Sequence, residues 1–126
     1  AESQDGLHWR QENTVCIEPL QALEANTRPS VLRTQAGYEM WFSYRHSVDF
    51  RDGAGAYRIG HAVSKDGKNW RRQDDPQGLA PVSGSEWNNR MMAYPHVLEV
   101  DGRRLMFHNG NGFGAAGFGY AVWQDD

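Results

Sequence analysis

Two loops of this sequence carry side chains that could hold a polar ligand. The first loop, Arg45–Asp52, contains Arg45 and Arg51 as hydrogen-bond donors, with His46 and Asp49 as further polar contacts. Guanidinium groups bind carboxylates and phosphates through paired hydrogen bonds, so this composition favours a sugar acid or a phosphate as the ligand. The alternative is a solvated loop held by its own ion pairs. An acid–base pair of His46 and Asp49 lacks any neighbour that would place a substrate.

The second loop, Asn109–Gly114, is a glycine-rich turn around Phe113. The carboxamides of Asn109 and Asn111 suit sugar hydroxyls, and an aromatic ring can stack on the apolar side of a pyranose. A bulged hairpin with glycines at positive φ explains the same composition. Trp87 lies in a polar linker and is a candidate stacking platform.

The remaining reactive residue types do not assemble into a catalytic or metal-binding motif. The five histidines share no metal-ligand spacing, and the single cysteine, Cys16, excludes a disulfide framework and a cysteine-rich zinc site. No nucleophile elbow, P-loop or Cys–His dyad occurs. We therefore expect no metal ion, no cofactor and no catalytic residue. His96, beside Tyr94, is expected to contact a ligand instead.

Charge and hydropathy argue against two classes of partner. Sixteen acidic and thirteen basic side chains give a net charge of −3. Both signs are interspersed, which argues against a nucleic-acid-binding stripe and against a polybasic membrane anchor. No apolar run approaches the roughly 20 residues that cross a bilayer. A polar start without a secretory signal, together with a single cysteine, favours a cytoplasmic location.

The elements that position these loops are expected to be strands. The sequence contains 14 glycines and 12% aromatic residues, and it lacks long runs of helix-forming residues. Its β-branched and aromatic runs alternate with a period of two between Gly, Asp and Asn turns, as in Tyr38–Tyr44 and Arg104–His108. Only Pro19–Ala25 has a composition that could form a helix, and this segment is short for an isolated helix. These features predict an all-β fold.

Internal repeats organise the strands. Three segment pairs recur in the same order: Ser3–Trp9 with Ser64–Trp70, Pro29–Leu32 with Pro95–Leu98, and Ile59–Val63 with Phe118–Val122. Within the same scheme we match Met40–Phe42 with Leu105–Phe107. A period of about 60 residues fits a four-stranded repeat with long loops.

The repeats predict a single domain over residues 1–126, built as two propeller-like blades of four antiparallel strands. The first blade spans residues 29–73, with strands near 30–34, 38–45, 57–64 and 69–73. The second spans residues 94–123, with strands near 94–100, 103–109 and 117–123. A blade-closing strand at residues 7–11 is expected to complete a sheet, because an open edge invites pairing with another chain.

Several motifs together resemble a known family. They are Ser-x-Asp-Gly-x-x-Trp, Arg28-Pro29, Met40–Arg45, Tyr57–Gly60 and Asn109–Gly114. This combination resembles the five-bladed propellers of the glycoside hydrolase family 32 and 43 superfamily, which includes invertases, levanases, arabinanases and xylosidases. The resemblance covers nearly the whole of this chain. It covers only about the last two blades of a family member.

Two blades do not close a ring, which takes four to eight. A lone pair would leave apolar faces in water, and such faces mark interaction surfaces. We therefore expect several copies of this chain to associate and complete a ring. The alternatives are a fragment of a longer protein and a two-layer sandwich of two sheets.

The resemblance implies a ligand site in a funnel at the ring axis, lined by Arg28, Arg45, Tyr94, His96, Asn109 and Asn111. Glycoside cleavage needs a carboxylic acid and a carboxylate. The family places acidic residues directly before one proline that opens a strand and two residues before another. Here those positions hold Arg28, before Pro29, and Ala93, two residues before Pro95; Arg90 stands where a relative could carry an earlier Glu.

Three functions remain open at this point. The first is a non-catalytic module for carbohydrate binding or assembly. The second is a glycoside hydrolase, or a piece of one, whose carboxylates come from missing blades or another subunit. The third is a structural interaction protein without a ligand site.

Overall fold

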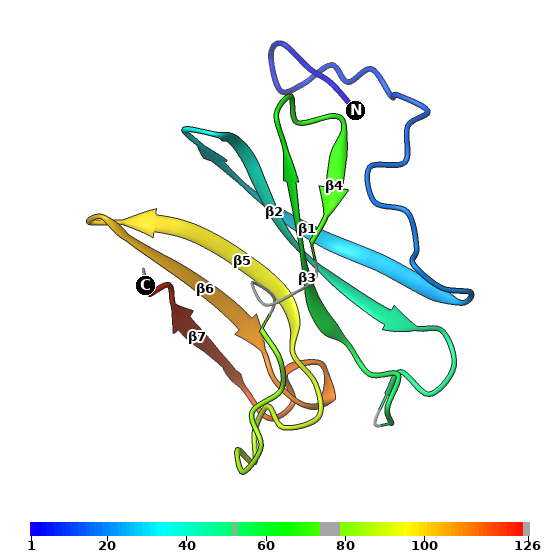
Figure 1. The fold of residues 1–126 in the computed structure, drawn as a ribbon, viewed down its shortest axis with the longest axis vertical. Coiled ribbons are helices and arrows are strands. Elements are labelled where there is room, and N and C mark those ends of the chain that lie inside the picture. The colour runs from blue at the N-terminus through cyan, green and yellow to red at the C-terminus, as the bar shows by residue number, and fades with distance from the viewer. Residues whose placement is uncertain (52, 74–78, 125–126) are drawn as a thin grey trace.

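The computed structural model describes residues 1–51, 53–73 and 79–124 and contains two antiparallel sheets (Figure 1). The first sheet has the order β1-β2-β3-β4, with β1 at Glu24–Thr34, β2 at Gly37–His46, β3 at Arg58–Ser64 and β4 at Trp70–Arg72. The second sheet has the order β5-β6-β7, with β5 at Ala93–Val100, β6 at Arg103–Asn109 and β7 at Phe118–Val122. One short 3₁₀ turn, η1, spans Gly112–Gly114. The all-β prediction is confirmed, and the described residues form no closed barrel.

The turn between β3 and β4 is held by the side chains of Ser64 and Asp66. The Asp66 carboxylate accepts the backbone N–H groups of Lys68 and Asn69 at 2.9 and 2.8 Å, while the Trp70 indole N–H donates to the Gly67 carbonyl at 3.1 Å. These donated hydrogen bonds, led by the Asn69 N–H, hold the pKa of Asp66 well below its usual range.

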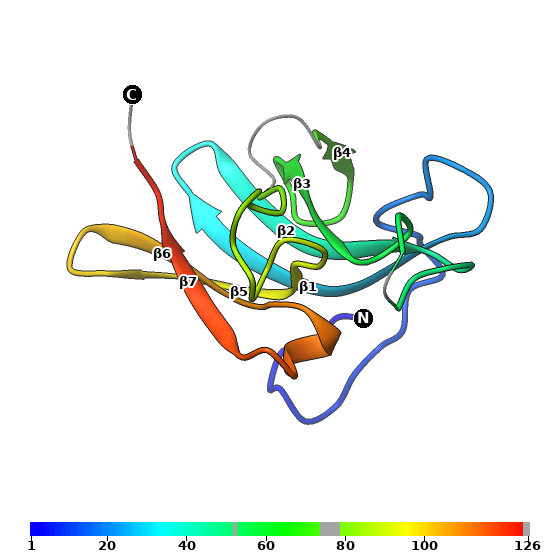
Figure 2. The ribbon, with the colours of Figure 1, turned by 90° about the horizontal axis from the view of Figure 1, so that it is seen from below.

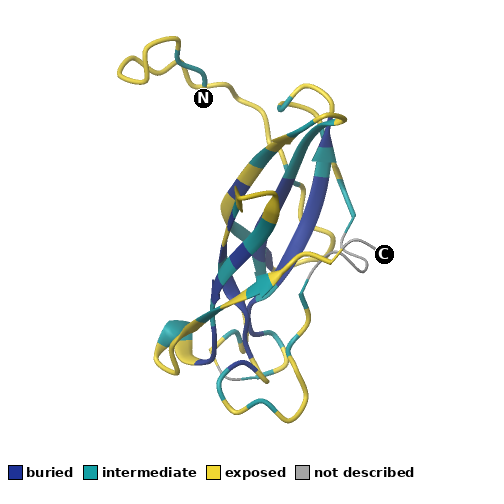
Figure 3. Cartoon of the chain, turned by 90° about the vertical axis from the view of Figure 1, so that its left-hand side faces the viewer, coloured by how far each residue is buried: buried dark blue, intermediate teal, exposed yellow. Residues whose placement is uncertain are grey.

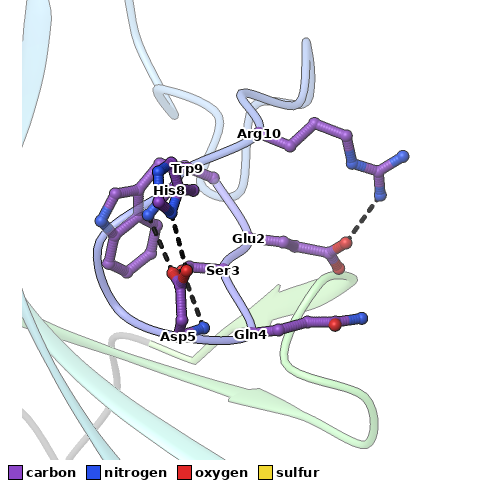
Figure 4. A pocket seen from close by; sticks show the side chains of 8 residues that line it. Glu2, Ser3, Gln4, Asp5, His8, Trp9 and Arg10 are labelled. Atoms are coloured by element: carbon purple, nitrogen blue, oxygen red, sulfur yellow. Dashed lines mark hydrogen bonds and ion pairs between the residues drawn. The ribbon is translucent and has the colours of Figure 1, made fainter.

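The same turn occurs near the N-terminus, in the matching segment Ser3–Trp9. The Asp5 carboxylate accepts the N–H groups of Leu7 and His8 at 2.9 and 2.8 Å, and the Trp9 indole N–H donates to the Gly6 carbonyl at 3.1 Å. Figure 4 shows Asp5 pointing toward His8 inside this turn. The N–H of His8 leads the contacts that lower the pKa of Asp5. The repeat found in the sequence is thus reproduced in the hydrogen bonds of the two turns.

The structure differs from the expectation for residues 7–11, which join neither sheet. The N-terminal turn closes on itself instead, because Glu2 and Arg10 exchange backbone hydrogen bonds of 2.8 Å in an isolated bridge. An ion pair between Glu2 and Lys68 places this turn beside the β3–β4 turn, away from β7 (Figure 1). Residues 1–23 are largely exposed (Figure 3).

Each sheet has a bulge in its first strand. The register shifts between Thr27 and Ser30 in β1 and between Ala93 and His96 in β5. The residues before the two prolines, Arg28 and Tyr94, have φ values of 55° and 59°. Such positive φ is strained for non-glycine residues and persists only where the surrounding structure fixes it. The two bulges therefore occupy equivalent positions of the repeat.

The strand registers correct one detail of the repeat. Ser30 pairs with Trp41 in the first sheet, and His96 pairs with Phe107 in the second. Since Ser30 and His96 are equivalent, Trp41 corresponds to Phe107 and not to Met106 as the sequence match implied. The sequence match is shifted by one residue because both strands carry consecutive apolar side chains.

The two sheets meet mainly through β5, which contacts β1, β2 and β3 (Figure 2). Trp41 and Ile59 of the first sheet pack with Val97 and Met106 of the second in one buried cluster, which also includes Met92. Trp41 is 0% exposed, which agrees with its predicted packing role. Burial of such side chains contributes about 1.5–3 kcal/mol each.

Two hydrogen bonds cross between the sheets at the bulges. The Ser43 hydroxyl accepts the Tyr94 N–H at 2.7 Å, and the Ser30 hydroxyl accepts the Val97 N–H at 2.8 Å. Because both donors belong to β5 and both acceptors to the first sheet, these bonds fix the start of β5 against β1 and β2.

Candidate functional site

Several chain segments meet at the end of the molecule where β2 ends and β3 begins. The β2–β3 register pairs Tyr44 with Arg58, so the next residues outward, Arg45 and Tyr57, face each other. The Arg45 Nε donates to the Tyr57 hydroxyl at 3.1 Å. The guanidinium carbon of Arg45 also lies 4.2 Å from the centre of the Phe50 ring. Tyr57 is buried and forms the centre of the site.

Tyr94 and Arg28 join the same centre from the two bulges. The Tyr94 ring lies 5.4 Å from the Tyr57 ring, and the guanidinium carbon of Arg28 lies 5.3 Å from the Tyr94 ring. Phe113, from the loop after β6, meets the Tyr57 ring edge-on at 5.9 Å. We call this set the arginine–aromatic cluster; its members are Arg28, Arg45, Phe50, Tyr57, Tyr94 and Phe113.

The two arginines of the cluster lie against aromatic rings, and Arg45 also donates a hydrogen bond from Nη1 to the His46 carbonyl at 3.3 Å. Neither Arg28 nor Arg45 forms a salt bridge with a described residue. Their charges rest instead on ring faces, which attract cations. Partial burial, reinforced by Tyr57, raises the pKa of Tyr94. The cluster can therefore donate hydrogen bonds to an anion beside partly exposed aromatic surface.

His46 and Asp49 lie in the neighbouring loop, where the His46 side chain bonds to the loop backbone. The His46 Nδ1 accepts the Val48 N–H at 3.2 Å. Asp49 has a φ of 63°, and its carboxylate occupies the space where a Cβ at position 53 would stand, so the carboxylate packs directly against Gly53. No hydrogen bond joins His46 to Asp49 among the described residues. Both shape the loop that carries Phe50.

The two predicted asparagines have different surroundings. The Asn109 Nδ2 donates to the Phe113 carbonyl at 3.1 Å, so Asn109 borders the cluster. Asn111 is buried and saturated: its Oδ1 accepts the N–H groups of Arg90 and Met91, and its Nδ2 donates to two oxygens, of Glu86 and Asn89. The Asn111 side chain therefore organises the loop before β5 and has no hydrogen-bonding group left for a ligand.

His96 does not join the cluster. It lies beyond the β5 bulge, is exposed, and pairs with Phe107 on the face of the second sheet that points away from the first. The structure therefore brings three predicted residues together (Arg28, Arg45 and Tyr94), places Asn109 beside them, and leaves His46, Asp49, Asn111 and His96 outside.

The sequence interpretation missed Tyr57, the centre of the cluster. The sequence did contain a signal for it. The predicted strands 38–45 and 57–64 have equal length, and antiparallel pairing over their full length sets residue 57 opposite Arg45. Trp87, the candidate stacking platform, is instead packed against the second sheet. Its ring stacks on His108 at 5.2 Å and 16°, and burial lowers the pKa of His108.

The N-terminal turn borders a concave region of about 940 Å³, lined by residues 1–5 and 8–10 (Figure 4). Its polar groups bond to one another within the N-terminal turn, as between Arg10 and Glu2 at 2.8 Å, and no residue of either sheet contributes. We therefore place the candidate site at the arginine–aromatic cluster. Among the described residues, no group of three metal-ligating side chains occurs, and no helix is long and apolar enough to cross a membrane.

Comparison with known proteins supports the fold. The chain is 36% identical over 126 residues to two uncharacterised proteins of Mycobacterium tuberculosis, from strains CDC 1551 / Oshkosh and ATCC 25618 / H37Rv. The match covers 99% of this chain but 39% of the length of each relative. No family model matches the sequence.

A solved structure, a family 117 glycoside hydrolase from the marine bacterium Zobellia galactanivorans, is similar with a TM-score of 0.57 and 16% identity. The similarity covers 72% of this chain and 31% of that protein. At this identity the likeness concerns the fold alone. The chain therefore has a glycosidase-like fold.

Proposed function

We propose that this chain is a carbohydrate-binding part of a glycosidase-like propeller of the family 32 and 43 type, and that it binds an acidic sugar without cleaving it. The observation that carries the proposal is the arginine–aromatic cluster. It gathers, around tilted and edge-on aromatic rings, two arginines that have no carboxylate partner among the described residues.

The chemistry of the cluster matches that of a uronate. The guanidinium groups of Arg28 and Arg45 can hold a carboxylate through charge-assisted hydrogen bonds. The rings of Tyr94 and Phe113 offer apolar surface on which a pyranose can stack. The hydroxyl of Tyr57 orients the guanidinium of Arg45 from behind, at 3.1 Å, so the donor is held before a ligand arrives.

Hydrolysis is not part of this proposal because the cluster contains no carboxylate. Glycoside cleavage requires two carboxyl groups placed on either side of the bond. At the two positions where the resembled family carries acids, this chain has Arg28, whose guanidinium lies over Tyr94, and Ala93, which is buried.

Calorimetric titration with acidic and neutral oligosaccharides tests the proposal. We expect binding of uronate-containing oligosaccharides only, with a dissociation constant that Arg45→Met raises about ten- to a hundredfold, since one charge-assisted hydrogen bond contributes about 1.5–3 kcal/mol. Tyr57→Phe should weaken binding less, because it removes only the group that orients Arg45. The matched control is Arg33→Met, an exposed arginine of β1 outside the cluster. A flat response to every sugar would contradict the proposal and favour a purely structural role.

A second candidate function is glycoside hydrolysis with carboxylates supplied from outside this chain. It is favoured by the fold shared with the family 117 glycoside hydrolase and by the 39% share of its relatives that the chain spans. Assays with aryl-glycosides separate the two functions. Product release by one of the longer relatives that this chain matches, but not by this chain alone, would favour hydrolysis over binding without cleavage.

A further inference from the structure

The second sheet has an apolar face that no described residue covers. Alternate residues of β7 point away from the first sheet, and two of them, Phe118 and Tyr120, are 74% and 63% exposed. The register places Tyr120 beside Phe107, whose ring is 5.9 Å away. We call this surface the outer face; its members are His96, Leu98, Leu105, Phe107, Phe118, Tyr120 and Val122.

The repeat identifies the face of the first sheet that is equivalent to the outer face. Outer-face residues have counterparts in the first sheet, and those counterparts are covered by the second sheet. The pairs from first to second sheet are Trp41 with Phe107, Ile59 with Phe118, His61 with Tyr120, Leu32 with Leu98 and Ser30 with His96. Trp41, Ile59 and His61 are at most 3% exposed. The outer face thus repeats a packing surface whose partner is missing from it.

The required partner surface is present on the first sheet of the same chain. Val97 and Met106 are the residues of the second sheet that pack on Trp41 and Ile59. Their counterparts in the first sheet are Val31 and Met40, which are identical in type and lie on the side turned away from the second sheet. Val31 is 48% exposed, whereas Met40 is 5% exposed because Ile17, Tyr44 and Trp70 pack against its cluster.

A groove already exists at that position. Val31 and Met40, with Pro29, Tyr38 and Trp70, line a cavity of about 470 Å³. Its other border is the N-terminal segment, through Glu12, Thr14 and Cys16. This segment must shift to admit a sheet, and residues 1–16 are joined to no strand by a sheet ladder.

The polar contacts between the sheets can repeat as well. Ser43 accepts the N–H of Tyr94 within the chain, and the counterparts are Asn109, as acceptor, and the N–H of Arg28. Ser30 accepts the N–H of Val97, and the counterparts are the His96 ring and the N–H of Val31. The acceptors lie on the second sheet of one copy and the donors on the first sheet of the other copy, as a head-to-tail contact requires.

We propose that the outer face of one copy docks on the Val31–Met40 side of the first sheet of a second copy, repeating the interface that joins the two sheets within the chain. Such a head-to-tail contact is heterologous, so it either closes into a ring or grows into a filament. This interface goes beyond the proposed sugar site and does not depend on it.

Two opposite surface variants test the proposal. Phe118→Asp disables the outer face, and Val31→Asp disables the facing side. In analytical ultracentrifugation the unmodified chain should associate with rising concentration, while each variant alone should stay near 14.3 kDa. Mixed together, the two variants should form a one-to-one dimer, because each retains the surface that the other lacks. Leu20→Asp, at an exposed leucine outside both surfaces, should associate like the unmodified chain.

The outcomes of these experiments distinguish between the possible partners of the outer face. A monomeric unmodified chain, or a mixture that stays monomeric, would overturn the proposal and leave the outer face for a different partner. If Phe118→Asp blocks association but Val31→Asp does not, the contact is face to face and the head-to-tail assignment is wrong. Circular dichroism verifies that each variant is folded, and Tyr120→Asp with Val31→Lys provides a second pair.

Discussion

At the scale of single residues, Asp5 and Asp66 make the same hydrogen bonds in two different settings. Each carboxylate accepts two backbone N–H groups, at 2.9 and 2.8 Å, and contacts the polar side chain three positions later at 2.7 Å. The Asp66 turn connects β3 to β4, whereas the Asp5 turn ends in an isolated bridge. The two aspartates make the same contacts, but only the Asp66 turn connects two strands of a sheet.

We therefore expect Asp66→Ala and Asp5→Ala to differ in their effect on stability. Asp66→Ala should lower the midpoint of thermal unfolding by several degrees, because the donors of the turn lose their acceptor and β4 loses its anchor. Asp5→Ala should leave the midpoint nearly unchanged, since its turn lies outside both sheets. Differential scanning calorimetry of the two variants measures the difference. Equal losses would mean that the N-terminal turn is part of the cooperative unit.

At the scale of elements, Trp87 connects the loop before β5 to the second sheet. Its indole covers Gly119 of β7, where a Cβ would lie 2.6 Å from the ring, and its carbonyl accepts the Asn111 N–H at 2.7 Å. Trp87 also stacks on the buried His108. One side chain thus holds a loop, β6 and β7 together, which explains why β7 requires glycine at that position.

Gly119→Ala should displace this indole and destabilise the protein by about 1–3 kcal/mol, the usual cost of overpacking. The same substitution in a Trp87→Leu background should cost much less, because the atoms that clash are gone. Urea unfolding of the two single variants and the double variant gives the coupling energy. A coupling energy near zero would show that Trp87 does not rest on β7.

The strands were predictable from the sequence because they alternate and are bounded by turns. Predicted strands at 38–45, 57–64 and 103–109 match β2, β3 and β6 within one residue at each end. The position of residues 7–11 was not predictable in this way. The hydrogen bonds of the Asp5 turn hold these residues beside the N-terminus, so they do not join a sheet. Of the residues predicted for the site, Arg28, Arg45 and Tyr94 lie together in the cluster. Asn111 lies outside it, because its side chain contacts residues 86–91, which are far from it in sequence.

At the scale of the whole molecule, one ionic network ties the two sheets together. Glu39 of β2 lies between His61 of β3, 3.2 Å away, and Arg104 of β6, also 3.2 Å away. Arg104 in turn reaches Glu99 of β5 at 3.2 Å, and its guanidinium lies 5.5 Å from the Trp41 ring. The network therefore joins four strands of both sheets, and three of them (β2, β5 and β6) meet at the Arg104 guanidinium.

Removing that guanidinium should loosen the contact between the sheets without disturbing either sheet. Arg104→Met keeps an apolar stem against Trp41 but leaves Glu39 with a single partner, so we expect a loss of about 1–3 kcal/mol, the contribution of charged hydrogen bonds at a partly buried site. Arg103→Met, next in sequence but exposed at the β5–β6 turn, is the matched control. In urea unfolding followed by tryptophan fluorescence, Arg104→Met should lower the midpoint while Arg103→Met should not. Because the two sheets share one buried cluster, the unfolding curve of Arg104→Met should remain a single transition; two separate transitions would mean that the sheets fold independently and that Arg104 is what couples them.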